Sequence, residues 1–264
     1  MDLQLTGKTA FVSGSTAGIG FAIAHALARE GARVIVNGRT QSAVDDAAAR
    51  LSRGLQAGRV RGFAGDLSTE AAADELARRH PEVSILVNNF SIFEPQSFEQ
   101  ISDADWRRFF EANVLSGVRL ARLFLPAMKR ADWGRIIFIS SESAIQIPVE
   151  MIHYGMTKAA QIAVARGLAE SVSGTGITVN SILPGPTRSR GVGDFVAKLA
   201  AEQGKSFEEF EREFFTKMRP SSILQRFIEP DEIGPLVAYI ASPLASATTG
   251  AALRVDGGVV RSAF

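Results

Sequence analysis

Short runs of apolar residues alternate with longer stretches in which apolar residues recur every three or four positions. The short runs predict buried strands, and the longer stretches predict amphipathic helices. The predicted strands cover residues 8–13, 32–37, 60–64, 83–87, 136–139, a segment ending near 183, and 252–255. This alternation predicts an α/β fold in which a doubly wound parallel sheet of the Rossmann type, with about seven strands, carries helices on both faces.

One region interrupts this rhythm between the sixth strand and the last predicted helix, which covers 231–241. Within it, residues 194–203 and 207–218 have the pattern of two amphipathic helices, which predicts an ordered helical insertion and not a linker. The rest of the chain shows no boundary or repeat. We therefore predict a single domain over residues 1–264.

Composition narrows the function classes. The chain has 264 residues, a formal net charge of +1 and no cysteine. Intermixed charges predict no binding to nucleic acid or membranes, and three scattered histidines predict no metal site. The first strand begins near the start of the sequence and no apolar run reaches membrane-spanning length, so we expect a cytoplasmic protein.

A glycine-rich turn follows the first predicted strand and precedes a helix predicted over 21–30. Its spacing, Gly-x-x-x-Gly-x-Gly, is a variant of the dinucleotide-binding Gly-x-Gly-x-x-Gly. Glycines allow a tight turn and a close approach of the backbone to a pyrophosphate, which the helix N-terminus then receives. The residues predicted to bind the dinucleotide here are Gly14, Ser15, Thr16, Gly18, Ile19 and Gly20.

The second predicted strand ends in Gly38-Arg39-Thr40, where the adenosine ribose of a dinucleotide should lie. An NAD site would place a carboxylate there, whereas an arginine can pair with the 2′-phosphate of NADP. NADP(H) is therefore favoured, with NAD(H) as the alternative. A solvated surface arginine is the other interpretation of Arg39.

Polar residues end the third and fourth predicted strands. Asp66 and Leu67 are expected beside the adenine, and Asn89 beside the ribose, because ligands bind beyond the carboxyl ends of parallel strands. Asp66 could instead cap the following helix, a role for which Ser68 competes.

Tyr154 and Lys158 stand at positions i and i+4 of a predicted helix, downstream of Ser141 at the end of an apolar strand. This spacing places the ammonium near the phenol, and a nearby positive charge favours phenolate. We expect Tyr154 to exchange a proton with a substrate oxygen that Ser141 holds.

Together, these motifs resemble the short-chain dehydrogenase/reductase family over essentially the whole chain, and they are similar to its 3-oxoacyl-ACP reductase-like members. The resemblance implies that Tyr154 is the acid/base, that Ser141 orients the substrate and that Lys158 holds the nicotinamide ribose. It implies that Asn113 completes a proton relay through water. Residues implied at the nicotinamide are Pro184, Gly185, Thr187 and Ser189.

The resemblance further implies that residues 187–227 form a substrate lid, and that the protein forms homo-oligomers, dimers or tetramers. Three departures from the family pattern stand out. Phe90-Ser91 replaces the usual Ala-Gly, which should narrow the space near the nicotinamide. Ser13 replaces the usual Thr and keeps a hydroxyl at that position. Ala17 occupies a position that is basic in many NADP-dependent members. Extra apolar positions on a long helix predicted over 103–129 also favour self-association.

The expected reaction is NAD(P)(H)-dependent hydride transfer between a carbonyl and a secondary alcohol on a small molecule. The pocket should be mostly apolar. Glu142 and Glu150 near it could bind hydroxyl or amine groups, and Arg188 and Arg190 could meet an anionic substrate, although solvated or lid-locking charges are the favoured interpretation of all four. Small alcohols, sugars, keto acids and acyl thioesters all remain candidate substrates. The expected apolar lining of the pocket is Phe93, Ile145, Ile147, Met151 and Phe195. The alternatives are an enzyme like the nucleotide-sugar epimerases or dehydratases, which carry a different glycine spacing, and a non-catalytic NADPH-sensing regulator, in which a damaged Tyr-Lys-Ser set would be expected.

Overall fold

The computed structural model describes residues 1–189 and 205–263. Within these ranges a parallel sheet of seven strands has the order β3-β2-β1-β4-β5-β6-β7. The predicted doubly wound fold is confirmed. The strands are β1 (Thr9–Val12), β2 (Arg33–Gly38), β3 (Val60–Ala64), β4 (Ile85–Asn88), β5 (Gly134–Ile139), β6 (Ile177–Pro184) and β7 (Ala252–Val255).

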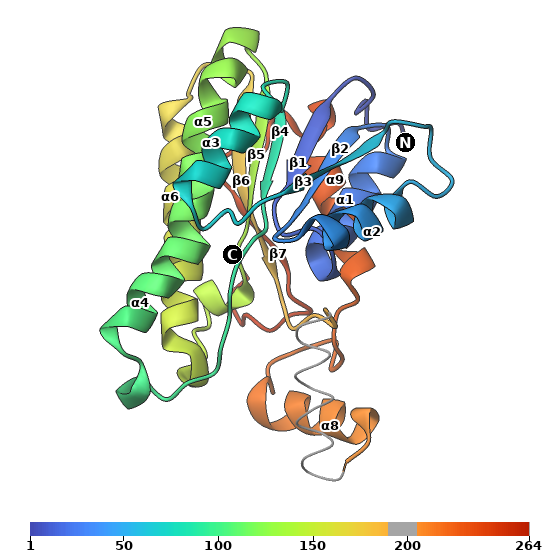
Figure 1. The fold of residues 1–264 in the computed structure, drawn as a ribbon. Coiled ribbons are helices and arrows are strands. Elements are labelled where there is room, and N and C mark those ends of the chain that lie inside the picture. Colours follow the sequence, from blue (N-terminus) through green and yellow to red (C-terminus); the bar gives the residue numbers. More distant parts are fainter. Residues whose placement is uncertain (190–204, 264) are drawn as a thin grey trace.

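Helices cover both faces of the sheet (Figure 1). One face carries α1 (Gly18–Arg29), α2 (Gln41–Leu51) and α9 (Gly234–Ile240), and the other carries α3 (Glu70–Arg79), α5 (Ser116–Ala131) and α6 (Ile152–Ser171). Two apolar cores follow from this layering. Ile23 and Leu27 of α1 are buried in the first, and Phe124 of α5 in the second. Strands buried on both faces explain the continuous apolar runs in the sequence.

The strand order reverses between β1 and β4, which are neighbours although two strands separate them in the sequence. Ligands bind in the crevice at such a reversal, beyond the carboxyl ends of the strands. The fold therefore directs the glycine turn after β1 and the residues after β4 and β5 toward one region.

The long helix predicted over 103–129 is interrupted. It begins as α4 (Asp103–Phe110), where Ser102 and Asp105 form a capping box, and continues into α5 through a π-helical turn at Glu111–Leu115. The wider turn is centred on Asn113. Such turns often mark functional sites.

The described part of the insertion contains α8 (Phe207–Glu213), capped by Ser206, and a π-helical turn at Phe214–Met218. Three buried phenylalanines, Phe210, Phe215 and Phe227, form a small core of its own. Figure 1 shows α8 beyond the carboxyl edge of the sheet, apart from the covering helices. The helix predicted over 194–203, which includes Phe195, lies outside the described residues, as does Arg190. Across the part that is described, no helix is long and apolar enough to cross a membrane.

Candidate active site

The glycine turn after β1 forms a tight cradle. Gly14 and Gly18 have positive φ angles of 60° and 58°, a region that glycine adopts at little cost. A Cβ on Gly20 would lie 2.5 Å from the Asn89 side-chain nitrogen and 2.6 Å from the Gly14 carbonyl oxygen. Helix α1 begins at Gly18, three residues before the predicted start, and its N-cap Ala17 supplies no side-chain hydrogen bond. Its N-terminal amides therefore suit a phosphate.

Hydrogen bonds hold this cradle in place. Asn89 donates to the carbonyl oxygens of Ser13 and Gly14, at 2.9 and 3.0 Å. The Ser13 hydroxyl accepts hydrogen bonds from the amides of Asn89 and Phe90. The hydroxyl that serine shares with the usual threonine at this position therefore has a structural role. The buried Asn37 accepts a hydrogen bond from the Gly14 amide at 3.0 Å. It donates to the carbonyl oxygens of Phe63, within β3, and of Gly65, just after that strand. The sequence analysis missed Asn37, although a polar residue at the end of an apolar strand was its signal.

A small pocket of about 170 Å³ adjoins the cradle where adenosine was expected. Its lining includes Thr16, Arg39, Asp66 and Leu67. The capping alternative for Asp66 is wrong, as is that for Ser68. Thr69 is the N-cap of α3, while Asp66 accepts hydrogen bonds from Ser68, because these residues form a turn one step before the helix.

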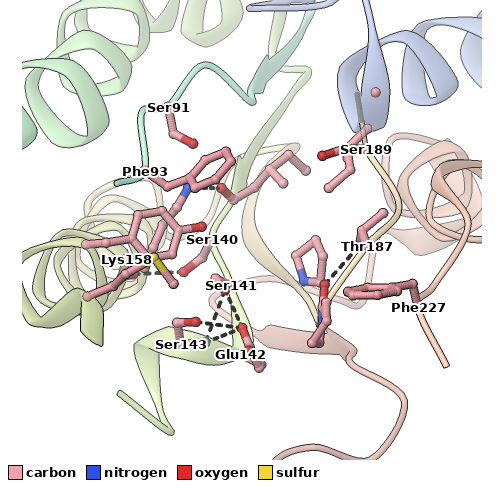
Figure 2. Close-up of a pocket in the computed structure, with 18 of the residues that line it drawn as sticks. Ser91, Phe93, Ser140, Ser141, Glu142, Ser143, Lys158, Thr187, Ser189 and Phe227 are labelled. Carbon is pink, nitrogen blue, oxygen red and sulfur yellow. Dashed lines mark hydrogen bonds between the residues drawn. The ribbon is translucent and has the colours of Figure 1, made fainter. Parts of the chain in front are cut away.

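A larger cavity of about 550 Å³ lies beyond the carboxyl ends of the strands. It brings together most of the predicted site from segments far apart in the sequence (Figure 2). The predicted residues that line it are Gly14, Gly18, Ile19, Gly20, Asn89, Ser141, Tyr154, Lys158, Pro184, Gly185, Thr187 and Ser189. Ser15 lies beneath it, fully buried, with its hydroxyl bonded to the backbone of β1 and β2.

The end of β6 supplies the far wall of this cavity. The Thr187 hydroxyl donates to the Gly185 carbonyl oxygen at 2.8 Å, and the Thr187 backbone bridges to Ile228. A Cβ on Gly185 would lie 2.5 Å from the Asp256 carbonyl oxygen, so only glycine fits there. In Figure 2, Thr187 and Phe227 lie across the pocket from Lys158.

Ser141 shares its surroundings with a buried carboxylate. Its hydroxyl donates to Glu142 at 2.5 Å and accepts from the Ser143 amide at 3.1 Å. Ser143 donates to the same Glu142 oxygen through both its amide and its hydroxyl. Figure 2 shows the two serines gathered around Glu142. Glu142 and Ser143 were not among the predicted catalytic residues.

Lys158 is fully buried and donates to the Ile139 carbonyl oxygen at 2.9 Å and to Gln161 at 3.3 Å. Burial lowers the pKa of Lys158 to about 7. Its ammonium lies 5.5 Å from the centre of the Tyr154 ring.

The predicted lowering of the Tyr154 pKa is wrong for this structure. Burial raises the pKa of the Tyr154 phenol, the Glu142 carboxylate raises it further, and a hydrogen bond to Ser141 lowers it. A lysine that is itself partly neutral at pH 7 does not offset these effects. The phenol is therefore held in its protonated form.

Asn113 is buried in the π-helical turn and is not among the residues that line the cavity. Its side chain accepts from the Ile92 amide at 2.7 Å and donates to the Ile92 carbonyl oxygen and to Thr157, each at 3.0 Å. Its side chain is thus occupied, while its backbone carbonyl oxygen accepts from Gln161 at 2.5 Å. The link from Asn113 to Lys158 runs through Gln161, a residue that the sequence analysis did not select.

The insertion closes the cavity with aromatic rings that the sequence did not single out, including Phe210, Phe214 and Phe227. Phe93 and Met151 line the cavity as predicted, and Phe93 meets the Tyr154 ring edge-on at 6.4 Å. Ile145 and Ile147 were wrongly placed. Both are about half exposed and outside the cavity lining, because the short helical turn after Ser141 directs them outward.

Comparison with known proteins agrees with this geometry. A family model described as enoyl-(acyl carrier protein) reductase matches residues 14–260. The oxidoreductase YvaG of Bacillus subtilis (strain 168) is 48% identical over 264 residues, which is 100% of both chains. The D-beta-hydroxybutyrate dehydrogenase of Cupriavidus necator is 34% identical, with 97% of this chain and 99% of that protein covered.

The chain belongs to the short-chain dehydrogenase/reductase family. The crystal structure of L-sorbose reductase from Gluconobacter frateurii, complexed with NADPH and L-sorbose, is similar to this short-chain dehydrogenase/reductase with a TM-score of 0.93. The two are 29% identical, and the match covers 99% of this chain and 100% of that one. The protein is therefore an NAD(P)-binding oxidoreductase that acts on carbonyl or alcohol substrates. Neither the epimerase nor the regulator alternative is supported.

Proposed function

We propose that this enzyme reduces a small carbonyl compound to a secondary alcohol with NADPH, and that Tyr154 is the proton donor. The observation that carries the proposal is the convergence of Ser141, Tyr154 and Lys158 on one cavity that continues into the glycine cradle. In this direction Tyr154 acts as the acid, and burial and Glu142, which raise its pKa, favour the protonated phenol that the step requires.

The residues present fit a nicotinamide dinucleotide. The cradle leaves no room for a Cβ at Gly20, the N-terminus of α1 carries no side-chain cap, and the β6 end closes over the cavity with Thr187 and Ser189. The bound cofactor would supply the hydride. Lys158 would hold the nicotinamide ribose, as the family resemblance implies.

The proton then moves from the protein to the substrate. Tyr154 donates its phenolic proton to the developing alkoxide oxygen, and Ser141 positions that oxygen once its hydroxyl turns from Glu142 to the substrate. Lys158, whose ammonium lies 5.5 Å from the phenol ring centre, stabilises the phenolate that remains. The aromatic wall supplied by the insertion, whose described part lies within 205–227, keeps water from the reacting atoms.

Preference for NADP(H) over NAD(H) is part of the proposal. Arg39 lines the adenosine pocket, and the turn that contains it carries no carboxylate. A guanidinium there pairs with a 2′-phosphate. The complex of L-sorbose reductase with NADPH supports this preference.

Self-association and a cytoplasmic location also belong to the proposal. Of the apolar residues on the long helix, Phe109 and Val114 are buried within the chain itself, whereas Phe110 is 40% exposed. Sedimentation of the purified protein at working concentration would test self-association, and monomers alone would contradict it.

The experiment follows NADPH absorbance in parallel with NADH, with a panel of ketones, aldehydes, sugars, keto acids and acetoacetyl thioesters. We expect turnover with NADPH, and Arg39→Ala should reduce kcat/KM for NADPH by at least about tenfold without changing that for NADH. Arg33→Ala is the matched control, since Arg33 is exposed at the opposite end of the same strand. An absence of turnover across the panel would contradict the proposal. The names of the relatives cover an anionic and an uncharged substrate, so similarity leaves the substrate class open.

A further inference from the structure

An ion-pair cluster lies at the substrate side of the large cavity. Arg219, which follows the π-helical turn of the insertion, is placed between two carboxylates from the segment after β5. Its Nε lies 3.4 Å from Glu142, and one of its terminal nitrogens lies 3.2 Å from Glu150. All three residues line the cavity.

The centre of the cluster is buried in the protein, whereas the Glu150 side chain at its edge is 28% exposed. Arg219 is 7% exposed and Glu142 is 4% exposed. The nitrogen of Arg219 that meets Glu150 also donates to the Met218 carbonyl oxygen at 2.8 Å, and the guanidinium lies over the Phe214 ring. The arginine is therefore committed to groups of the protein on several sides.

The cluster contains more negative than positive groups. Two carboxylates face one guanidinium, so the substrate side of the cavity carries a net negative charge. Among the described lining residues, the remaining cation is Lys158, which lies at the base of the cavity and is assigned to the cofactor ribose. The rest of the substrate wall is mostly apolar, with Phe93, Met151 and the rings of the insertion beside a few serine hydroxyls.

The two carboxylates and the mostly apolar wall together should select substrates by their charge. We propose that the substrate is an uncharged carbonyl compound with an apolar body, and that Glu142 and Glu150 exclude analogues that carry a carboxylate. The proposal rests on the function proposed above. A carboxylate in the cavity would meet two like charges in surroundings of low polarity, and the one nearby guanidinium is already paired with both of them.

The Glu142 carboxylate already contacts the reacting centre, since it accepts a hydrogen bond from Ser141 at 2.5 Å and raises the pKa of Tyr154. A second anion held beside it would add to the same field and make loss of the phenolic proton harder still. An uncharged substrate avoids this penalty. The cluster therefore bears on both the binding of the substrate and the proton transfer to it.

The test compares 4-acetylbenzamide with 4-acetylbenzoate, which share the same acetyl group and differ in the charge of a remote substituent. Calorimetric titration into protein saturated with NADP⁺ at pH 7.5 gives both dissociation constants without requiring turnover. We expect the amide to bind at least about tenfold more tightly. Equal or tighter binding of the acid, or binding of neither compound, would overturn the proposal.

Glu150→Gln removes one charge while keeping an oxygen for Arg219. The dissociation constant of 4-acetylbenzoate divided by that of 4-acetylbenzamide should fall several-fold in this variant. An unchanged ratio in a folded variant would overturn the proposal. Glu208→Gln is the matched control, because Glu208 is exposed on α8 and outside the cavity lining. NADPH turnover separates this inference from the proposed function. Selective binding of the amide with no turnover of any carbonyl compound counts against the function alone, whereas reduction of both compounds with equal affinity counts against the charge selection alone.

Discussion

The side-chain carbonyl of Gln161 lies 3.3 Å from the Lys158 ammonium, and its amide nitrogen lies 2.5 Å from the backbone carbonyl oxygen of Asn113. All three residues are buried. Gln161 therefore connects the lysine of α6 to the π-helical turn through fixed hydrogen bonds. The Asn113 carbonyl is free to meet this amide because the wider turn shifts the regular helical hydrogen bonding.

Gln161→Leu should remove the acceptor for Lys158 and leave the Asn113 carbonyl without its partner. We expect kcat to fall by about tenfold, since the lysine loses its fixed position, while the dissociation constant for NADPH changes by less than about threefold. Stopped-flow and fluorescence titration measure the two quantities. Gln41→Leu, an exposed position bonded to Asp45, is the control. An unchanged kcat in folded Gln161→Leu would show that the bridge has no role in turnover.

Lys158 should lower the stability of the protein at neutral pH. Its pKa is lowered from 10.5 to about 7 by burial, so between these values the folded protein binds fewer protons than the unfolded chain. The free energy of unfolding should therefore rise with pH across this window, through the contribution of this group.

Lys158→Met should abolish turnover and stabilise the fold at pH 7 by about 1–4 kcal/mol, because a buried charge is replaced by an apolar group. Urea unfolding at pH 7 and pH 9 measures this difference, which should shrink at the higher pH. Lys129→Met, at an exposed site near the end of α5, should leave stability within about 0.5 kcal/mol. A Lys158→Met variant that is less stable than the parent at pH 7 would contradict the account.

Gly20 and Gly167 form a natural pair for testing the cradle. A Cβ at Gly20 would press against Asn89 and the Gly14 carbonyl, whereas a Cβ at Gly167, in α6, meets nothing within 4 Å. Gly20→Ala should abolish measurable NADPH binding, because the cradle must open. Gly167→Ala should stabilise the protein by about 1 kcal/mol through helix propensity and leave binding unchanged. Thermal shift with and without NADPH measures both, and normal binding by Gly20→Ala would show that the cradle tolerates a methyl group.

The sequence predicted those parts of the site that depend on local spacing. Tyr154 and Lys158 share a helix face at i and i+4, and the glycines of the turn precede a helix, so both features were visible before the structure. The sheet followed from the buried apolar runs. These features depend on residues that are close together in the chain.

Features that depend on distant contacts could not be predicted in the same way. Arg219 reaches Glu142 across 77 positions, and no periodic pattern connects them. The π-helical turn around Asn113 interrupts the predicted long helix, and the contact that uses its free carbonyl comes from Gln161, 48 positions away on α6. Whether the Tyr154 pKa is raised or lowered depends on how the folded chain buries the phenol. The spacing between Tyr154 and Lys158 carries no information about that burial.

Tyr154→Phe tests the central claim most directly, and Tyr239→Phe is its control because Tyr239 is the second of the two tyrosines and is 39% exposed on α9. The measurement is kcat/KM for the best carbonyl substrate with NADPH, together with the NADPH dissociation constant. We predict that Tyr154→Phe loses at least about a thousandfold in turnover while still binding NADPH, and that Tyr239→Phe keeps both. Full turnover by Tyr154→Phe would contradict the assignment of this residue as the proton donor.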